Sequence, residues 1–281
     1  MKTQKNVASQ YFFASERSPF LEIRTTRDSV LPYAEHFHSE FSLGLILDGA
    51  TLFFLDGARH EAKGGDIVLI APGQAHRCNP IGGAPRSYHM LFIDQRWFRK
   101  QGCPELEERE AIGIRRPVIR DEVLFRHATT LVEAVLAGET DMNEALAGLL
   151  ITMRQQGCFG PAVKKKKGKR MPLPEKLLMP QAGSTAETAS RSVASLAREA
   201  GMRRESYSRA VRRTQGLPPN ACMHCLRLEL GRRLLRSGKS IAEAALASGY
   251  ADQSHFHRMF LRYFAATPGC YRTNRSHSYK K

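Results

Sequence analysis

The last hundred or so residues of this chain contain one pattern written twice, which limits the folds open to it. Each copy begins with a serine suited to cap a helix, followed by a short apolar segment, a glycine and a second segment with one polar edge. Glycine adopts the left-handed backbone that two helices meeting at a steep angle require. The sequence therefore predicts two helix-turn-helix units in tandem. The corresponding pairs are Ser192 and Ser240, Ala197 and Ala245, Gly201 and Gly249, Tyr207 and Phe256, Arg209 and Arg258, and Pro219 and Pro268.

Positive charge is concentrated in the same part of the chain. Residues 164–281 contain 25 Lys and Arg against 7 Asp and Glu, a net charge of +18, whereas residues 1–163 contain 18 against 20, a net charge of −2. Such asymmetry predicts a polyanionic partner for the C-terminal part. Double-stranded DNA is favoured over an anionic membrane, because no amphipathic anchoring helix stands out.

The second helix of each unit divides into an apolar and a polar face. In a helix that begins after Asp252, Phe256, Phe260 and Tyr263 recur at helical spacing and predict the buried side. The polar side chains are of the types that bond base edges in the major groove. The predicted DNA-contacting residues are Glu205, Ser208, Arg209 and Arg212 in the first unit and Gln253, Ser254, His257 and Arg258 in the second.

The segment from Ser192 to Arg272 resembles the DNA-binding domain of the AraC/XylS family of bacterial transcription regulators. Its most specific stretch runs from Ile241 through GYADQSHFHRMF, which ends at Phe260, to TPGCYR. The resemblance implies a long connecting helix at about 219–236, ended by Gly238, and places the second helix of each unit in the major groove.

Four positions in this domain depart from the family pattern: Arg203, Val211, Cys222 and Ala265. Ala265 stands where a glycine usually ends the last helix, and a Cβ in that left-handed position costs about 1 kcal/mol.

Two kinds of secondary structure are predicted in the N-terminal part. Within residues 30–95, short apolar runs are separated by Asp48-Gly49, Asp56-Gly57 and Pro72-Gly73, a pattern that predicts hairpins in a barrel or sandwich. From Asp121 the apolar period becomes helical and predicts a helical hairpin with an apolar stripe. We expect the stripe to form an isologous dimer interface, with packing against the barrel as the alternative. Its residues are Leu124, Leu131, Val135, Leu146, Leu150 and Met153.

Histidines in the N-terminal part are spaced so that they can meet. His36, His38 and Glu40 alternate and would share one face of a strand, His76 follows a turn, and His89 lies in a later apolar run. The pattern resembles the two cupin motifs, in which histidines and a glutamate hold a metal inside a small barrel. It is also similar to the sensor domains of many AraC-type regulators, which commonly bind an effector without a metal. We therefore expect these five residues to bind a small polar or charged effector, with no metal and no cofactor.

The predicted fold is multidomain, with α and β parts. Residues 1–118 are expected to form a cupin-like β-barrel that acts as the sensor, and residues 119–157 the helical hairpin. A basic flexible linker is expected at 158–188, with four consecutive lysines from Lys164, and an all-α domain with two helix-turn-helix units at 189–276.

These patterns predict a transcription regulator that binds DNA, responds to a small effector, forms a homodimer, can contact RNA polymerase and performs no catalysis. With no apolar run of about 20 residues and no signal peptide, a cytoplasmic protein with six reduced cysteines is expected. Cys222 and Cys225 lack the second pair that a structural zinc site needs. One alternative is a metal-dependent cupin enzyme with a DNA-binding domain, using His36, His38, Glu40 and His76. Another is a constitutive DNA-binding structural protein.

Overall fold

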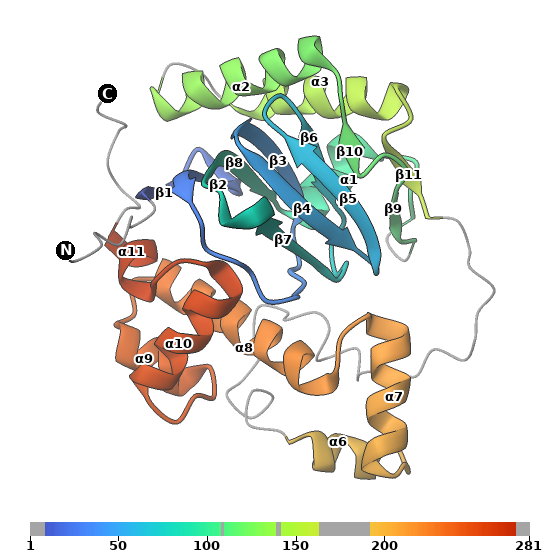
Figure 1. Ribbon diagram of the computed structural model, residues 1–281, viewed down its shortest axis with the longest axis vertical. Coiled ribbons are helices and arrows are strands. Elements are labelled where there is room, and N and C mark those ends of the chain that lie inside the picture. Colours follow the sequence, from blue (N-terminus) through green and yellow to red (C-terminus); the bar gives the residue numbers. More distant parts are fainter. Residues whose placement is uncertain (1–8, 108–109, 139–141, 163–191, 274–281) are drawn as a thin grey trace.

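The computed structural model describes residues 9–107, 110–138, 142–162 and 192–273, and it places a β-rich N-terminal domain against a helical C-terminal domain (Figure 1). None of the helices in these ranges is both long and apolar enough to cross a membrane.

Two packed sheets make up most of the N-terminal domain. The larger sheet has the order β1-β2-β8-β3-β6-β10 and the smaller has the order β5-β4-β7, with antiparallel neighbours throughout. These two sheets pack together without forming one continuously hydrogen-bonded barrel, which refines the predicted cupin-like β-barrel. The larger sheet contains β1 (Ser9–Ser15), β2 (Ser18–Ser29), β3 (Phe41–Asp48), β6 (Ile67–Ile70), β8 (Arg86–Ile93) and β10 (Val118–Ile119). The smaller contains β4 (Ala50–Leu55), β5 (Ala58–Lys63) and β7 (His76–Pro80).

The turns between these strands follow the predicted glycines. Gly49, between β3 and β4, has a φ of +75°, and a Cβ there would lie 2.4 Å from the carbonyl oxygen of Pro85. The position therefore excludes any other residue on both backbone and steric grounds.

The two faces of the larger sheet have different partners. Successive side chains of a strand point to opposite faces, so Leu21 and Ile23 of β2 enter an apolar core beneath the helices. Glu22 and Arg24, on the same strand, face the smaller sheet and the C-terminal domain. This alternation creates the cavity described below.

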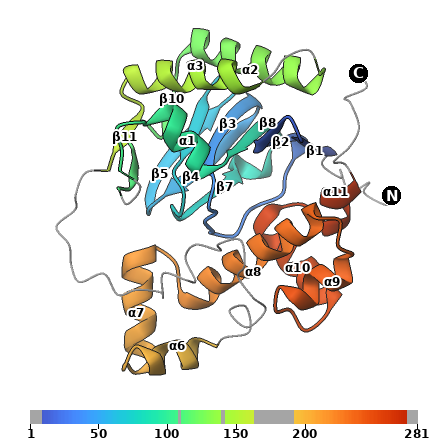
Figure 2. The same ribbon diagram turned by 180° about the vertical axis from the view of Figure 1, so that it is seen from behind.

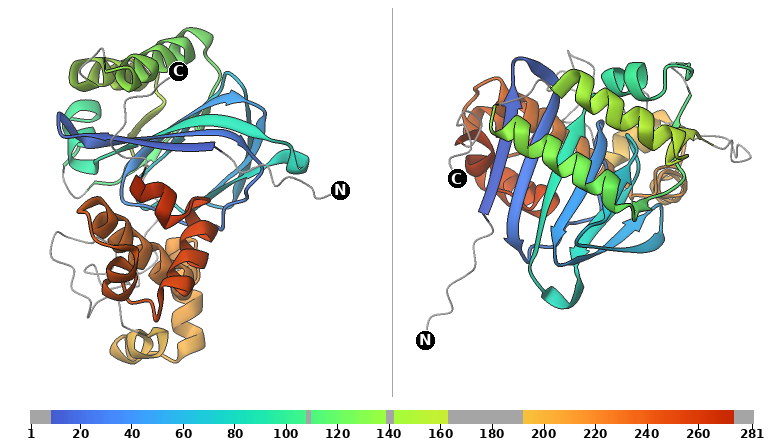
Figure 3. Two further views of the ribbon diagram at one scale, coloured as in Figure 1. Left: turned by 90° about the vertical axis from the view of Figure 1, so that its left-hand side faces the viewer. Right: turned by 90° about the horizontal axis from the view of Figure 1, so that it is seen from above.

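Three helices cover the apolar face of the larger sheet, as the view from above shows (Figure 3). They are α1 (Gln95–Gly102), α2 (Glu122–Leu136) and α3 (Met142–Gln155). The expectation that the α2–α3 stripe forms a dimer interface is wrong for these residues, because they pack against the sheet within one chain. Leu124 and Val135 are each 4% exposed, Leu146, Leu150 and Met153 are fully buried, and Leu131 packs against the same core.

The first residues of the range expected to be a linker are ordered. Phe159–Pro161 forms β11, which pairs with β9 (Ile112–Ile114), and the Phe159 ring lies against Phe41 and Phe98. The lysine run from Lys164 lies outside the described residues.

The C-terminal domain contains the two predicted helix-turn-helix units. Figure 2 shows the first unit at one end of α8 and the second at the other end. Capping boxes begin α6 at Ser192 and α9 at Ser240, and Gly201 and Gly249 have positive φ in the turns, as predicted. The connecting helix spans Pro219–Arg236, as predicted. The helices are α6 (Val193–Glu199), α7 (Arg204–Gln215), α8 (Pro219–Arg236), α9 (Ile241–Ala247), α10 (Gln253–Phe264) and α11 (Pro268–Thr273).

The two domains share an apolar cluster. Phe12, Phe37 and Ala75 of the N-terminal domain are buried in the core that fills the helical domain. The Phe12 ring meets the Tyr271 ring edge-on, with 4.8 Å between centroids. The helical domain is thus docked on the sheet domain through apolar contact as well as through the polar groups described next.

Candidate ligand cavity and nucleic-acid interface

A cavity of about 640 Å³, including its mouth, lies between the two sheets. Its walls come from alternate residues of β2, β3, β6 and β8, from β4 and β7, and from the loop before β3. Phe264, the last residue of α10, closes one side, so the helical domain contributes to the wall. The lining side chains are Arg24, Tyr33, His36, His38, Ile46, Thr51, Val68, Ile70, His76, Cys78, Arg86, Tyr88, Met90, Phe92 and Phe264.

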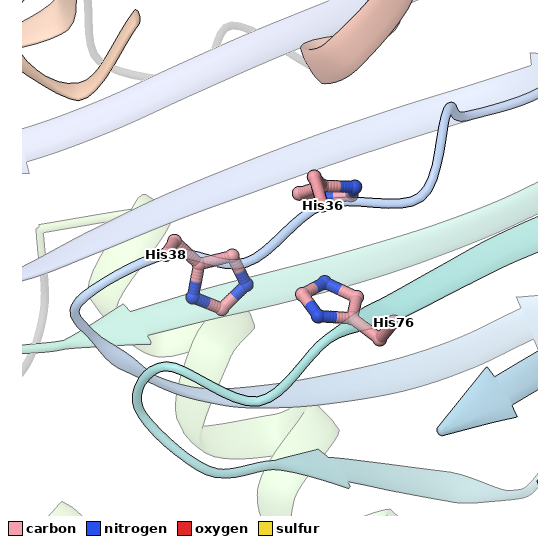
Figure 4. A group of neighbouring side chains, drawn as sticks. All are labelled: His36, His38 and His76. Carbon is pink, nitrogen blue, oxygen red and sulfur yellow. The ribbon is translucent and has the colours of Figure 1, made fainter. Parts of the chain in front are cut away.

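Three of the predicted histidines meet in this cavity (Figure 4). His36 and His76 exchange backbone hydrogen bonds of 2.9 and 2.8 Å, and the ring centroids of His38 and His76 are 4.7 Å apart. Each Nδ1 bonds a backbone carbonyl, at 2.8 Å to Ala34, 3.1 Å to Glu40 and 2.8 Å to Gln74 for His36, His38 and His76 respectively. Since a carbonyl can only accept, Nδ1 is the protonated nitrogen in each ring, and each Nε2 keeps its lone pair.

The three imidazoles are neutral. Burial lowers the pKa of His36 to about 4 and lowers the pKa values of His38 and His76 well below the usual value, and the neighbouring imidazoles lower the last two further. Their ligand atoms lie within 4.8 Å of one another. A metal with tetrahedral bonds needs nitrogens about 3.4 Å apart, so the rings have to close slightly to hold one. The donor chemistry fits a zinc-like ion, with the Nδ1 bonds to carbonyls fixing each ring.

The structure does not place Glu40 and His89 with these histidines. Residues 31–40 form a loop rather than the expected strand, and the Glu40 carboxylate turns to Arg232 of α8. His89 lies on the opposite face of β8 from the cavity residues Tyr88 and Met90. There its Nδ1 bonds the Thr25 hydroxyl at 2.9 Å.

Two arginines in the cavity were missed by the sequence analysis. Arg24 is 3% exposed and Arg86 is 1% exposed. Their guanidinium carbons lie 5.6 and 5.9 Å from the centroid of the Tyr33 ring, and the Tyr33 hydroxyl bonds that of Tyr88 at 2.5 Å. The available signal was the alternation of charged and apolar residues from Leu21 to Arg24, since a charge on a buried strand needs a polar site to face.

The sheet domain also completes the C-terminal end of α10. The carbonyls of its last turn are orphaned within the helix and need donors. Ala34 N–H donates to the Arg262 oxygen at 3.0 Å, Arg24 Nη1 donates to the Phe264 oxygen at 2.5 Å, and Gln10 Nε2 donates to the Ala265 oxygen at 2.5 Å. Ala265 has a φ of +48°, the left-handed conformation expected from its place in the sequence. Arg24, which lines the cavity, thus bonds the end of the helix that is predicted to contact DNA.

A second polar contact between the domains is centred on Glu22. Its Oε2 accepts hydrogen bonds from Arg236 Nε at 2.9 Å and from the Tyr271 hydroxyl at 2.6 Å, and Arg232 lies 3.7 Å from its Oε1. Burial alone would raise the pKa of Glu22, but Arg236 and Arg232 outweigh it, and the pKa is lowered. Glu22 therefore remains a buried carboxylate that holds α8 and α11 to the sheet.

The predicted DNA-contacting residues lie on the outer faces of α7 and α10. All are exposed except Ser208, which is half-buried: Glu205, Ser208, Arg209, Arg212, Gln253, Ser254, His257 and Arg258. The opposite faces are buried as expected, with Tyr207 and Val211 in α7 and Phe256 and Phe260 in α10. Asp252 caps α10 through its bond to His255 N–H at 2.7 Å, whereas Arg203 gives α7 no side-chain cap.

Cys222 and Cys225 are buried packing residues of α8. Burial raises the pKa of the Cys222 thiol to about 12, and its Sγ lies 3.7 Å from the Leu217 carbonyl oxygen. Neither cysteine joins a cluster of possible metal ligands among the described residues.

Comparisons with known families divide the chain as the fold does. Residues 21–122 match the family model of the AraC-like ligand binding domain, and residues 196–274 match that of a helix-turn-helix domain. The chain is 22% identical to the uncharacterized HTH-type transcriptional regulator YbfI of Bacillus subtilis, over 79% of this chain and 81% of that protein. It is 22% identical to the HTH-type transcriptional activator RhaS of Salmonella arizonae, over 92% of this chain and 93% of that protein.

Among solved structures, ToxT from Vibrio cholerae has the same fold. The TM-score is 0.57 at 14% sequence identity, and the likeness covers 90% of this chain and 97% of ToxT. The two-domain arrangement is therefore shared over nearly the whole length of both proteins.

Proposed function

Because this chain belongs to the AraC/XylS family of transcription regulators, we propose that it binds specific DNA sequences and that a small molecule in the sheet-domain cavity modulates this binding. The observation that supports this most is Arg24, which lines the cavity and bonds the end of α10. A ligand that changes the surroundings of Arg24 acts directly on a DNA-reading helix.

The DNA-binding part of the proposal rests on the exposed faces of α7 and α10. In this arrangement the two helices enter successive major-groove segments about 34 Å apart on one side of the duplex. Arginine pairs bidentately with guanine, so Arg258→Ala should cost about 1–3 kcal/mol of specific affinity and relax base choice at one position.

Gel-shift titration of full-length protein on a site selected from random DNA tests this part. Arg59→Ala is the matched control, because Arg59 is an exposed arginine on β5 of the sheet domain. We expect the control to bind like wild type and Arg258→Ala to bind the selected site more weakly but random DNA about equally. Wild-type affinity of Arg258→Ala for the selected site would show that Arg258 does not read bases.

The regulatory part requires that a ligand bind one arrangement of the two domains better than the other. A difference of about 1–3 kcal/mol is typical of such coupling. This difference in ligand affinity arises from two contacts of the docked arrangement. Phe264 forms part of the cavity wall, and Arg24 bonds the end of α10. A ligand that left DNA affinity unchanged at saturation would favour a constitutive DNA-binding protein instead.

The proposal includes a homodimer, contact with RNA polymerase and action in the cytoplasm, where a regulator meets its DNA. Because the predicted stripe is buried, a dimer through the helical hairpin has to use its outward side. Val123 of α2 is 71% exposed there and Ile151 of α3 is 42% exposed.

A metal-dependent enzyme with a DNA-binding domain is the second candidate, favoured by the three converging imidazoles. A metal bound to His36, His38 and His76 would act as a Lewis acid toward a substrate in the cavity. Elemental analysis of protein purified without chelator and without an affinity metal distinguishes the two functions. A stoichiometric transition metal, together with turnover, would support the enzyme, and a metal-free protein that still responds to a ligand would exclude it.

A further inference from the structure

We propose that the ligand cavity takes an organic acid, whose carboxylate is held by Arg24 and Arg86 and whose body is apolar. This inference rests on the proposed function, because it names the chemical class of the effector for that cavity. The histidines, which the sequence analysis put at the centre of effector binding, are then wall residues rather than the charge-recognising groups.

The first observation is an excess of buried positive charge. Arg24 and Arg86 both line the cavity and are almost fully buried, yet among the residues that the structure describes no carboxylate lies within 4 Å of either guanidinium. The three histidines add no negative charge. Buried cations are normally paired with an anion, so two cations without a carboxylate partner beside one cavity favour the binding of an anion there.

The second observation is an unused donor. Arg86 Nη2 donates to the carbonyls of Cys78 at 2.8 Å and Leu31 at 3.3 Å, but its Nη1 is buried and has no hydrogen-bond partner among the described residues. The large majority of buried side-chain polar atoms have a hydrogen-bond partner, so an unused donor that faces a cavity is available to a ligand. A carboxylate suits this remaining donor better than a neutral hydroxyl does, because a hydrogen bond between two charged groups is shorter and stronger.

The third observation concerns what surrounds the two arginines. The hydroxyls of Tyr33 and Tyr88 meet at 2.5 Å, beside both guanidinium groups, and the hydroxyl whose proton is not used in this bond can donate to the same anion. Much of the remaining wall is apolar: Ile46, Val68, Ile70, Met90, Phe92 and Phe264. These features fit one carboxylate attached to an apolar body.

This chemistry also explains how binding reaches the DNA. Arg24 donates to the carbonyl oxygens of Phe264 and Ala265 at 2.5 and 3.4 Å. A bound carboxylate competes for the same N–H groups, because it is a stronger acceptor than a neutral carbonyl. Its body competes with the Phe264 side chain for the cavity wall. An acid in the cavity therefore weakens the contact between the sheet domain and the end of α10.

Calorimetric titration of the full chain with benzoate, hexanoate and decanoate, each beside its primary amide, tests the inference. Acid and amide differ in charge and share their shape. We expect at least one acid to bind wild type at least tenfold more tightly than its amide, and Arg86→Met to lose that preference. Arg59→Met, which removes an exposed arginine from β5, should keep it.

Equal affinities for acids and amides, no binding by any acid, or an undiminished preference in Arg86→Met would each overturn the inference. If Arg86→Met does not fold, Arg86→Lys gives the answer: a point charge without the planar fork should bind the acid at least fivefold more weakly than wild type. Titrations repeated with EDTA separate the arginines from the histidines, since loss of acid binding with chelator would assign the carboxylate to a metal. Sequence-specific DNA binding without any acid tests the proposed function independently.

Discussion

Replacing Glu22 with glutamine should undock the two domains without changing the shape of the side chain. Glu22 belongs to β2 and is 2% exposed, whereas the groups that bond it, Arg236 and Tyr271, belong to α8 and α11. Removing one partner of a buried ion pair usually costs about 3–5 kcal/mol, because the other charge stays buried without compensation.

The structure places Glu22→Gln near the lower end of that range. The Arg236 side chain is 30% exposed and can be partly hydrated after the change. Arg232, at 2%, keeps its contacts with Glu40 and Glu229. The amide oxygen of glutamine can still accept one hydrogen bond. We therefore expect a loss of about 3 kcal/mol in the docked state, more than a hundredfold in the docking equilibrium.

Urea denaturation of the full chain, followed by fluorescence and circular dichroism, measures this loss. Glu122→Gln is the matched control, because Glu122 also pairs with an arginine, at 2.9 Å to Arg126, but its side chain is 88% exposed. Exposed pairs contribute about 0–1 kcal/mol. If Glu22→Gln and Glu122→Gln destabilise the protein to within 1 kcal/mol of each other, the Glu22 cluster does not hold the domains together.

Three further outcomes are expected. The difference in free energy of unfolding between wild type and Glu22→Gln should have its full value above about pH 4.3, the unfolded-state pKa of glutamate. It should disappear as the pH falls through the lowered pKa of Glu22 in the folded protein. Urea midpoints between pH 3 and 6 measure this change. His38→Ala or His76→Ala should weaken the ligand response in a reporter assay, because both rings line the cavity. Operator affinity without ligand, measured by gel shift, should stay within twofold, and equal loss of basal binding would make these histidines structural. Wild type should sediment as a dimer at micromolar concentration, and Val123→Glu should shift it toward monomer.

Local signals in the sequence predicted most of the helical domain. The serine caps at Ser192 and Ser240 and the turn glycines at Gly201 and Gly249 act within a few residues of themselves, so their effects can be read without the rest of the fold. The strands beside Gly49 and Gly57 were predicted for this reason too. The bounds of α8 came instead from the resemblance to the AraC/XylS family.

Partners far apart in the sequence could not be predicted in this way. Helical periodicity showed that Leu146 and Leu150 are buried, but the same stripe fits a second copy or a sheet of the same chain. Alternation from His36 to Glu40 suggested one shared face, whereas Glu40 pairs with Arg232, 192 residues later. No local pattern marks such a pair.

Ala265 connects these two cases. It breaks a local rule, since a helix that ends in a left-handed residue normally ends in glycine. The sheet domain compensates: Gln10 and Arg24 donate to the Ala265 oxygen, and the alanine side chain is 1% exposed in the shared interface. The end of α10 is therefore held by donors from the other domain rather than by its own cap. A helix end that depends on Arg24 responds to whatever binds Arg24. The alanine that breaks the local rule therefore lies between the cavity and the helix that we propose contacts DNA.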